Sequence, residues 1–99
     1  MHARLSTYEG GYPEDYDAGL EALRAEVLPG LRSLPGYRGA VSLVERATGR
    51  SVSITFWADE AALDATRQAV EEIRERAAAT SGSRILDVTE DEVGYLDLD

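Results

Sequence analysis

Few side chains in this sequence could do nucleophilic, acid–base or metal chemistry, because three reactive residue types are missing. The 99 residues contain no Cys, no Lys and no Asn, and all ten basic residues are Arg. A thiol nucleophile, an iron–sulfur cluster and a lysine Schiff base are therefore excluded. A histidine-based zinc site or a Ser-His-Asp triad would depend on the single histidine, His2. We expect no metal and no cofactor.

Three other side chains are candidate ligand contacts, since each could donate a hydrogen bond into a cavity. Tyr37 follows a Pro-Gly turn, and Trp57 ends an alternating segment with its indole N–H. Arg67 follows an apolar helical position, so its guanidinium could hold an anionic or enolate oxygen. Each also has a structural alternative: the Tyr packs in its turn, the Trp anchors a core or interface, and the Arg pairs with an acid such as Glu71.

Charge and length limit the partners and the size of the fold. Nineteen acidic and ten basic residues give a net charge of −9, which repels nucleic acid and anionic lipid. No apolar run approaches the ~20 residues that cross a bilayer. No secretory signal pattern opens the chain, and the lack of Cys fits a reducing compartment. We expect one cytoplasmic domain over residues 1–99 that binds neither nucleic acid nor a membrane.

Four segments predict the strands that must position the candidates. Residues 2–8 alternate in polarity, and residues 37–46 and 50–57 are rich in β-branched side chains and joined by a short glycine-containing link. The latter two predict a hairpin. Residues 84–89 predict a fourth strand, followed by an acidic C-terminal extension over residues 90–99.

Two segments predict helices. Residues 16–34 carry apolar side chains at steps of three and four, after Pro13 and Asp15 at a favourable start. Pro29 predicts a kink or a break within this helix. Residues 59–82 carry a second stripe. Its expected N-cap and terminator are Asp59 and Gly82.

The order strand, helix, strand, strand, helix, strand is that of a ferredoxin-like α+β fold, the split βαββαβ with a four-stranded antiparallel sheet. Helices then cover one sheet face, and the other must be wet or covered by another chain. Ala40, Val44 and Trp57 on mixed faces favour covering by a second copy, a homodimer. Arg4 could then reach a carboxylate across the dimer interface.

Residues 2–10, 34–40 and 55–63 together resemble the antibiotic biosynthesis monooxygenase family. The strongest elements are the Pro-Gly-aromatic turn before Tyr37 and Trp57 just before an acid-capped helix. The resemblance implies a dimeric α+β barrel with a cavity between the sheet and the helices of each subunit.

The same resemblance implies two chemistries, of which one fits this sequence. The haem-degrading branch is disfavoured, because the sequence has no Asn, and Arg67 and Ala77 stand near that branch's helical Trp and His positions. Cofactor-independent oxygenation of an aromatic small molecule remains, with Tyr37 and Arg67 as donors. The alternatives are a non-catalytic ligand-binding or dimeric interaction protein of the same fold, and a dimerisation module with no cavity. Whether the chain is an enzyme stays open.

Overall fold

The computed structural model describes residues 1–11, 14 and 16–99, so the expected roles of Pro13 and Asp15 lie outside the described residues. The predicted ferredoxin-like element order is confirmed, with each helical connection divided in two. The elements are β1 (His2–Gly10), α1 (Tyr16–Glu26), α2 (Leu28–Arg32), β2 (Tyr37–Glu45), β3 (Arg50–Trp57), α3 (Glu60–Ala65), α4 (Arg67–Ser81) and β4 (Ser83–Glu92).

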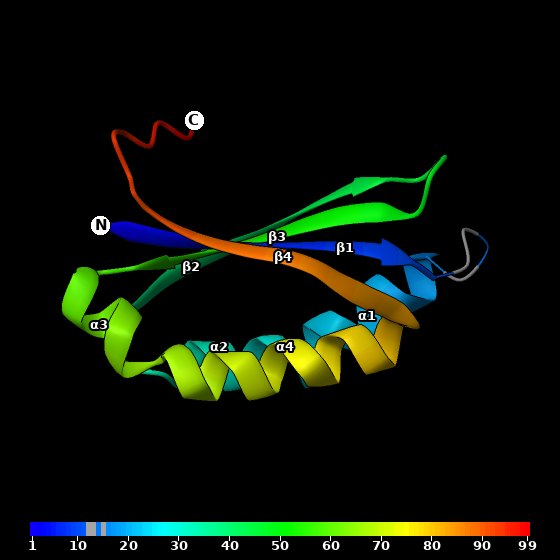
Figure 1. The fold of residues 1–99 in the computed structure, drawn as a ribbon, viewed down its shortest axis with the longest axis horizontal. Coiled ribbons are helices and arrows are strands. Elements are labelled where there is room, and N and C mark those ends of the chain that lie inside the picture. The colour runs from blue at the N-terminus through cyan, green and yellow to red at the C-terminus, as the bar shows by residue number, and fades with distance from the viewer. Residues whose placement is uncertain (12–13, 15) are drawn as a thin grey trace.

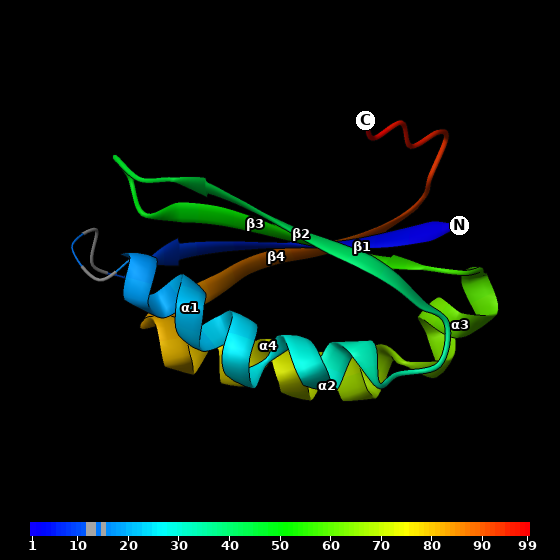
Figure 2. The ribbon, with the colours of Figure 1, turned by 180° about the vertical axis from the view of Figure 1, so that it is seen from behind.

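One antiparallel sheet carries the fold, in the strand order β2-β3-β1-β4. The helices lie against one face of this sheet, and the opposite face is open in both ribbon views (Figures 1 and 2). The segment after β4 rises on the open side (Figure 1). Any site between sheet and helices must therefore be built from the helix-facing side chains.

Both helical connections are interrupted. The first breaks at Val27, so that Pro29 lies in the first turn of α2, where its missing N–H costs no helical hydrogen bond. This confirms the predicted break. The second was expected as one helix but divides at Thr66, whose hydroxyl donates to the Ala62 carbonyl at 2.7 Å. A side chain that bonds back to the preceding turn competes with the helical ladder and bends the helix.

The predicted ends of the second connection are confirmed. The Asp59 side chain accepts a hydrogen bond from the Ala62 backbone N–H at 2.8 Å, as an N-cap does. Gly82 ends α4 in the left-handed conformation with a φ of 69°. Gly49 likewise takes a positive φ, 77°, in the β2–β3 hairpin.

The fourth strand is longer than predicted, which corrects the start of the acidic extension. β4 continues through Glu92, so residues 90–92 belong to the sheet rather than to a solvated tail. The strand continues because β1 offers ladder partners to its very start: Asp91 lies opposite Ala3 and Glu92 opposite His2. Here the pairing of the backbone outweighs the low strand propensity of acidic residues.

The two sheet faces differ from the expected mixed arrangement. Ala40 and Val44 lie opposite Thr55 and Ser51 and line the space under the helices, and Trp57 is fully buried there. Ala40 is exposed and Val44 half-buried at the cavity, so none of the three lies on the face that a second copy would cover. The open face instead carries other apolar side chains from β1, β2 and β3, namely Ala3, Leu5, Val41, Leu43, Val52, Ile54 and Phe56.

A close approach between the turn before β2 and α3 leads to a test of the fold. Gly36 has a φ of +82°, and a Cβ added there would lie 2.4 Å from the Cβ of Ala62. We expect Gly36→Ala to lower the free energy of unfolding by about 1–3 kcal/mol, through overpacking and backbone strain. Gly19→Ala is the control: Gly19 lies in α1 with nothing within 4 Å of its added Cβ, so this variant should gain about 0.5–1 kcal/mol. Urea unfolding curves that shift in the same direction for both variants would contradict this geometry.

Candidate functional site

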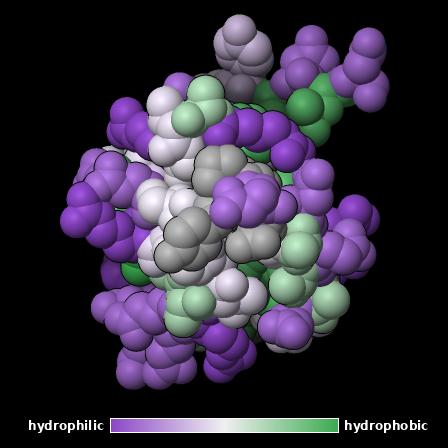
Figure 3. Space-filling model, turned by 90° about the vertical axis from the view of Figure 1, so that its right-hand side faces the viewer, coloured by the Kyte–Doolittle hydropathy of each residue, from purple (hydrophilic) through white to green (hydrophobic). Residues whose placement is uncertain are grey.

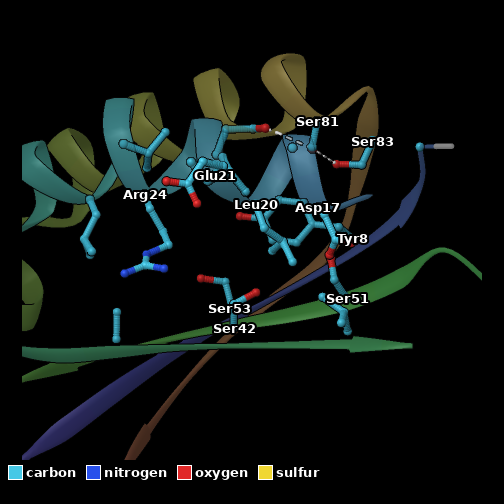
Figure 4. A pocket seen from close by; sticks show the side chains of 18 of the residues that line it. Tyr8, Asp17, Leu20, Glu21, Arg24, Ser42, Ser51, Ser53, Ser81 and Ser83 are labelled. Carbon is cyan, nitrogen blue, oxygen red and sulfur yellow. Dashed lines mark hydrogen bonds between the residues drawn. The ribbon is translucent and has the colours of Figure 1, made fainter. Parts of the chain in front are cut away.

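A cavity of about 600 Å³ lies between the sheet and the helices α1 and α2 (Figure 4). Small-molecule sites typically enclose about 300–1,000 Å³, so the space suits a ligand of that size. Residues from β1, β2 and β3 form one wall, and α1 and α2 form the other, with Ala77 and Ser81 of α4 at an edge. A cavity between sheet and helices, as the family resemblance implies, is therefore present.

The wall formed by the helices is apolar because the row of apolar side chains on α1 continues on α2. Its side chains recur at steps of three and four residues, so one face of the two helices points at the sheet. Val27 and Leu31 also belong to the buried core, which holds this wall in place. The wall is made by Leu20, Leu23, Val27, Leu28 and Leu31.

The sheet wall, by contrast, carries hydroxyl groups. Ser42 lies directly opposite Ser53, and Tyr8 lies opposite Ser51, so strand register groups these side chains on the helix-facing side. Ser81 and Ser83, which share a hydrogen bond of 2.6 Å, add two more hydroxyls where α4 meets β4 (Figure 4). Hydroxyls both donate and accept hydrogen bonds, so this wall can bind carbonyl or hydroxyl groups of a ligand.

Tyr8 is the largest polar side chain of the sheet wall. It is 9% exposed, and burial raises the pKa of its phenol, although Ser6 and the charge of Arg74 act in the opposite direction. The Arg74 Nε donates to the Ser6 hydroxyl at 2.9 Å, which fixes this group beside Tyr8. The phenol therefore stays protonated at neutral pH and can act as a donor.

Three charged residues of α1 line the cavity: Asp17, Glu21 and Arg24. Asp17 is exposed and pairs with Arg46 at 2.8 Å. Arg24 extends from α1 toward the sheet, where Ser42 and Ser53 also line the cavity (Figure 4). Among the described residues that line the cavity, Arg24 is the single cation.

Tyr37 and Trp57, two predicted ligand contacts, lie together in the core and not among the residues that line this cavity. Their rings meet edge to face, with centroids 6.0 Å apart and an interplanar angle of 81°. Trp57 is 0% exposed, and its indole N–H donates to the Thr55 hydroxyl at 3.0 Å. The hydrogen bond that a ligand would receive from this indole is thus made within the chain.

Arg67, the third predicted contact, lies on the surface at the start of α4. It binds Asp64 and Glu90, each at 2.7 Å, and these hydrogen bonds raise the pKa of its guanidinium. It too is absent from the residues that line the cavity. The structure therefore brings Tyr37 and Trp57 together and places Arg67 apart, and ligand contact by any of the three stays a prediction.

Arg4 corrects the expectation of a contact across a dimer interface. Its side chain is 1% exposed on the helix-facing side and pairs with Glu90 of the same chain, Nε to Oε2, at 2.8 Å. Its Nη2 donates to the Leu63 carbonyl at 2.7 Å, and its guanidinium lies 5.7 Å from the Trp57 ring centroid. Burial lowers the pKa of Arg4 and Glu90 opposes this, yet an arginine remains charged.

The cavity residues that sequence reasoning missed are the serines of β2 and β3 and Arg24 of α1. The alternation of Ser51, Ser53 and Thr55 was visible in the sequence. Such a polar face is ordinarily expected to face water. The signal was thus present, but nothing in the strand pattern says that the helices cover the polar side.

Two kinds of site are not found in the part of the chain that the structure describes. No group of three or more His, Asp or Glu side chains could hold a metal ion within residues 1–11, 14 and 16–99. Over the same residues, no helix is both long and apolar enough to cross a bilayer.

Sequence comparison finds relatives without an assigned role. The uncharacterised proteins Rv2557 and Rv2558 of Mycobacterium tuberculosis are 33% and 35% identical over 82 and 78 residues, which are 83% and 79% of this chain. The chain spans about a third of their length, 36% and 33%. No protein-family model matches the chain.

Comparison with solved structures identifies proteins that share the fold of this chain. SnoaB of Streptomyces nogalater, a cofactor-independent oxygenase, superposes with a TM-score of 0.67 at 20% identity over 96% of this chain and 94% of its own. The ActVA-Orf6 monooxygenase of Streptomyces coelicolor, solved with nanaomycin D, gives 0.66 at 17% identity over 98% and 92%. A dimeric ferredoxin-like protein from an uncultured marine organism gives 0.69 at 9% identity over the whole of both chains. The chain therefore has the ferredoxin-like fold found in antibiotic biosynthesis monooxygenase-like proteins.

Proposed function

We propose that this chain binds a flat aromatic small molecule in the cavity between α1 and the sheet. The main support is the lining of the cavity, whose volume is about 600 Å³: leucines and a valine form one wall, and hydroxyl groups form the opposite wall. Apolar lining with a few placed polar groups is typical of small-molecule sites. An aromatic ring would pack on α1 while its oxygen substituents bond to the serines.

The reaction we propose for such a ligand is oxygenation by O2 without a cofactor. SnoaB and ActVA-Orf6 support it, since both share this fold. With anthrone, loss of a ring proton gives an electron-rich enolate that reduces O2. One oxygen atom forms the new ring carbonyl, and the other leaves as water with the two ring hydrogens. Glu21 lines the cavity with no ion-pair partner among the described residues, so it is the group proposed to accept the first proton.

The test combines ligand binding with oxygen uptake. We expect the protein to bind anthrone and to accelerate O2 consumption in an oxygen electrode. Ser42→Leu, which places an alkyl group in the cavity, should weaken binding by about tenfold or more by loss of space. Ser33→Leu, at an exposed position outside the cavity, is the matched control. If the wild-type protein binds none of the aromatic probes, the proposal fails.

A non-catalytic binding protein of the same fold is the second candidate. The observation in its favour is the absence of Lys and Cys from the sequence and of His from the described cavity lining. Binding of anthrone with O2 uptake at the background rate would select this candidate over the oxygenase.

Ligand contact by Tyr37, Trp57 and Arg67 remains a separate proposal from the family resemblance. It requires a ligand that extends past the cavity toward the buried end of β3. Arg67→Gln tests it, because Arg67 is exposed and its change should leave the fold intact. A loss of affinity in this variant supports contact by Arg67, and an unchanged affinity removes Arg67 from the proposal.

We also propose a homodimer formed through the open sheet face. Leu43 is 53% exposed there, on the same strand as Val41 and beside Val52, Ile54 and Phe56 of β3. Monomers rarely expose contiguous apolar surface of this kind, and a two-fold interface would cover it. Light scattering should give twice the chain mass of 10.8 kDa, and Leu43→Glu should lower it. A wild-type monomer at high protein concentration would refute the dimer.

A further inference from the structure

We propose that Arg24 makes the cavity selective for aromatic ligands that carry an anionic oxygen, such as a carboxylate or an enolate. This inference rests on the proposed binding of an aromatic molecule and names the class of that molecule. Its basis is the availability of Arg24, its position between the two walls, and the charge of its surroundings.

Arg24 is an available cation in a chain rich in acids. Four other arginines form ion pairs within the described residues, whereas Arg24 forms none there, although the sequence holds 19 acidic residues. A guanidinium left without an anion in such a chain can accept one from a ligand without breaking a native pair. The four paired arginines are Arg4, Arg46, Arg67 and Arg84.

The position of Arg24 lets it act together with the hydroxyl wall. Arg24 is exposed, and it lies four residues after Leu20 and four before Leu28, which both line the same cavity. Its side chain extends toward the sheet wall that carries Ser42 and Ser53 (Figure 4). One carboxylate could therefore receive two guanidinium hydrogen bonds and a hydroxyl hydrogen bond, while the attached ring packs on the leucines.

The surroundings give no general attraction for anions. The net charge of the chain is −9, which disfavours anions in general. Hydrophilic side chains surround the end of the molecule that carries the β2–β3 hairpin (Figure 3). Glu21, three residues before Arg24 on α1, also lines the cavity. A preference for an anionic ligand must therefore come from Arg24 itself, and Glu21 should oppose it.

The experiment compares two probes with the same ring system, anthracene-2-carboxylate and 2-(hydroxymethyl)anthracene. The wild-type protein should bind the carboxylate more tightly than the alcohol, by about tenfold, as a charge-assisted hydrogen bond gives. Arg24→Gln should remove this preference and change the affinity for the alcohol by less than about twofold. Glu21→Gln should strengthen binding of the carboxylate. Arg32→Gln, on α2 and outside the cavity lining, is the matched control and should change neither affinity.

The outcomes separate this inference from the proposed function. Equal affinities for the two probes in the wild-type protein overturn the role of Arg24 and leave aromatic binding standing. Binding of neither probe overturns both. An equal loss of carboxylate affinity in Arg24→Gln and Arg32→Gln would show a diffuse charge effect, and would also overturn the inference.

Discussion

Replacing Glu90 by alanine is expected to lower the free energy of unfolding by about 3–5 kcal/mol, because it leaves a buried charge without its partner. The charge is the guanidinium of Arg4, which is 1% exposed and bound to Glu90 at 2.8 Å. Among the described residues, its other contacts are the Leu63 carbonyl and the Trp57 ring, and neither is an anion. Chemical unfolding at neutral pH measures the loss.

Two further variants distinguish this cause from a general loss of surface charge. Asp64→Asn removes the other carboxylate on Arg67, an exposed pair, and should cost about 0.2–1 kcal/mol. Adding Arg4→Met to Glu90→Ala removes the buried charge as well, so the double variant should be more stable than Glu90→Ala alone. Equal costs for Asp64→Asn and Glu90→Ala would contradict the buried pair.

The Glu90 carboxylate also makes the stability of the fold depend on pH. The hydrogen bond from Arg67, joined by that from Arg4, lowers the pKa of Glu90 in the folded state against an ordinary value of 4.5. The folded protein thus releases this proton more readily than the unfolded chain, and ionised Glu90 stabilises the fold above about pH 4.5. This contribution is lost as the pH falls through the lowered pKa. The stability difference between the wild-type protein and Glu90→Gln should therefore shrink on acidification.

The fold could be predicted from the sequence because its local signals agree with one another. Alternation and β-branched residues gave the strands, and Pro29, Gly49 and Gly82 marked a break, a hairpin and a helix end that the structure confirms. The errors in the predicted elements concern where a helix or strand begins and ends, and not whether it is a helix or a strand. β4 continues through Glu92 because β1 pairs with it. The local sequence of an acidic segment does not indicate that another strand will pair with it.

The site was less predictable, because a strand pattern separates two faces without saying which one the helices cover. The polarity of His2, Arg4, Ser6 and Tyr8 predicts a solvent-exposed face, yet Arg4 and Ser6 are buried under the helices. An arginine becomes compatible with that position through Glu90, which is 86 residues away in the sequence, and through the Leu63 carbonyl, which is 59 residues away. For the same reason Ser42 and Ser53 were not recognised as cavity residues. Which face of the sheet the helices pack against is decided only when the whole chain folds.

Trp57→Ala is expected to cost about 3–5 kcal/mol of unfolding free energy, because it removes a large side chain that is 0% exposed. The loss combines a void among the core residues with the edge contact to Tyr37 and the face on which Arg4 lies. It also leaves the Thr55 hydroxyl without the indole donor.

Because Trp57→Ala could fail to fold, Trp57→Phe separates a core role from contact with a ligand. Phenylalanine keeps an aromatic ring in the core but lacks the N–H, so stability should fall while the protein stays folded. Since Trp57 is not among the residues that line the cavity, its affinity for the anthracene probes should change by less than about twofold. Retained stability with a loss of affinity of about tenfold or more would instead establish the ligand contact that the family resemblance implies. The pairing of an unfolding curve with a binding isotherm on this one variant thus decides whether the tryptophan that ends β3 supports the fold or the ligand.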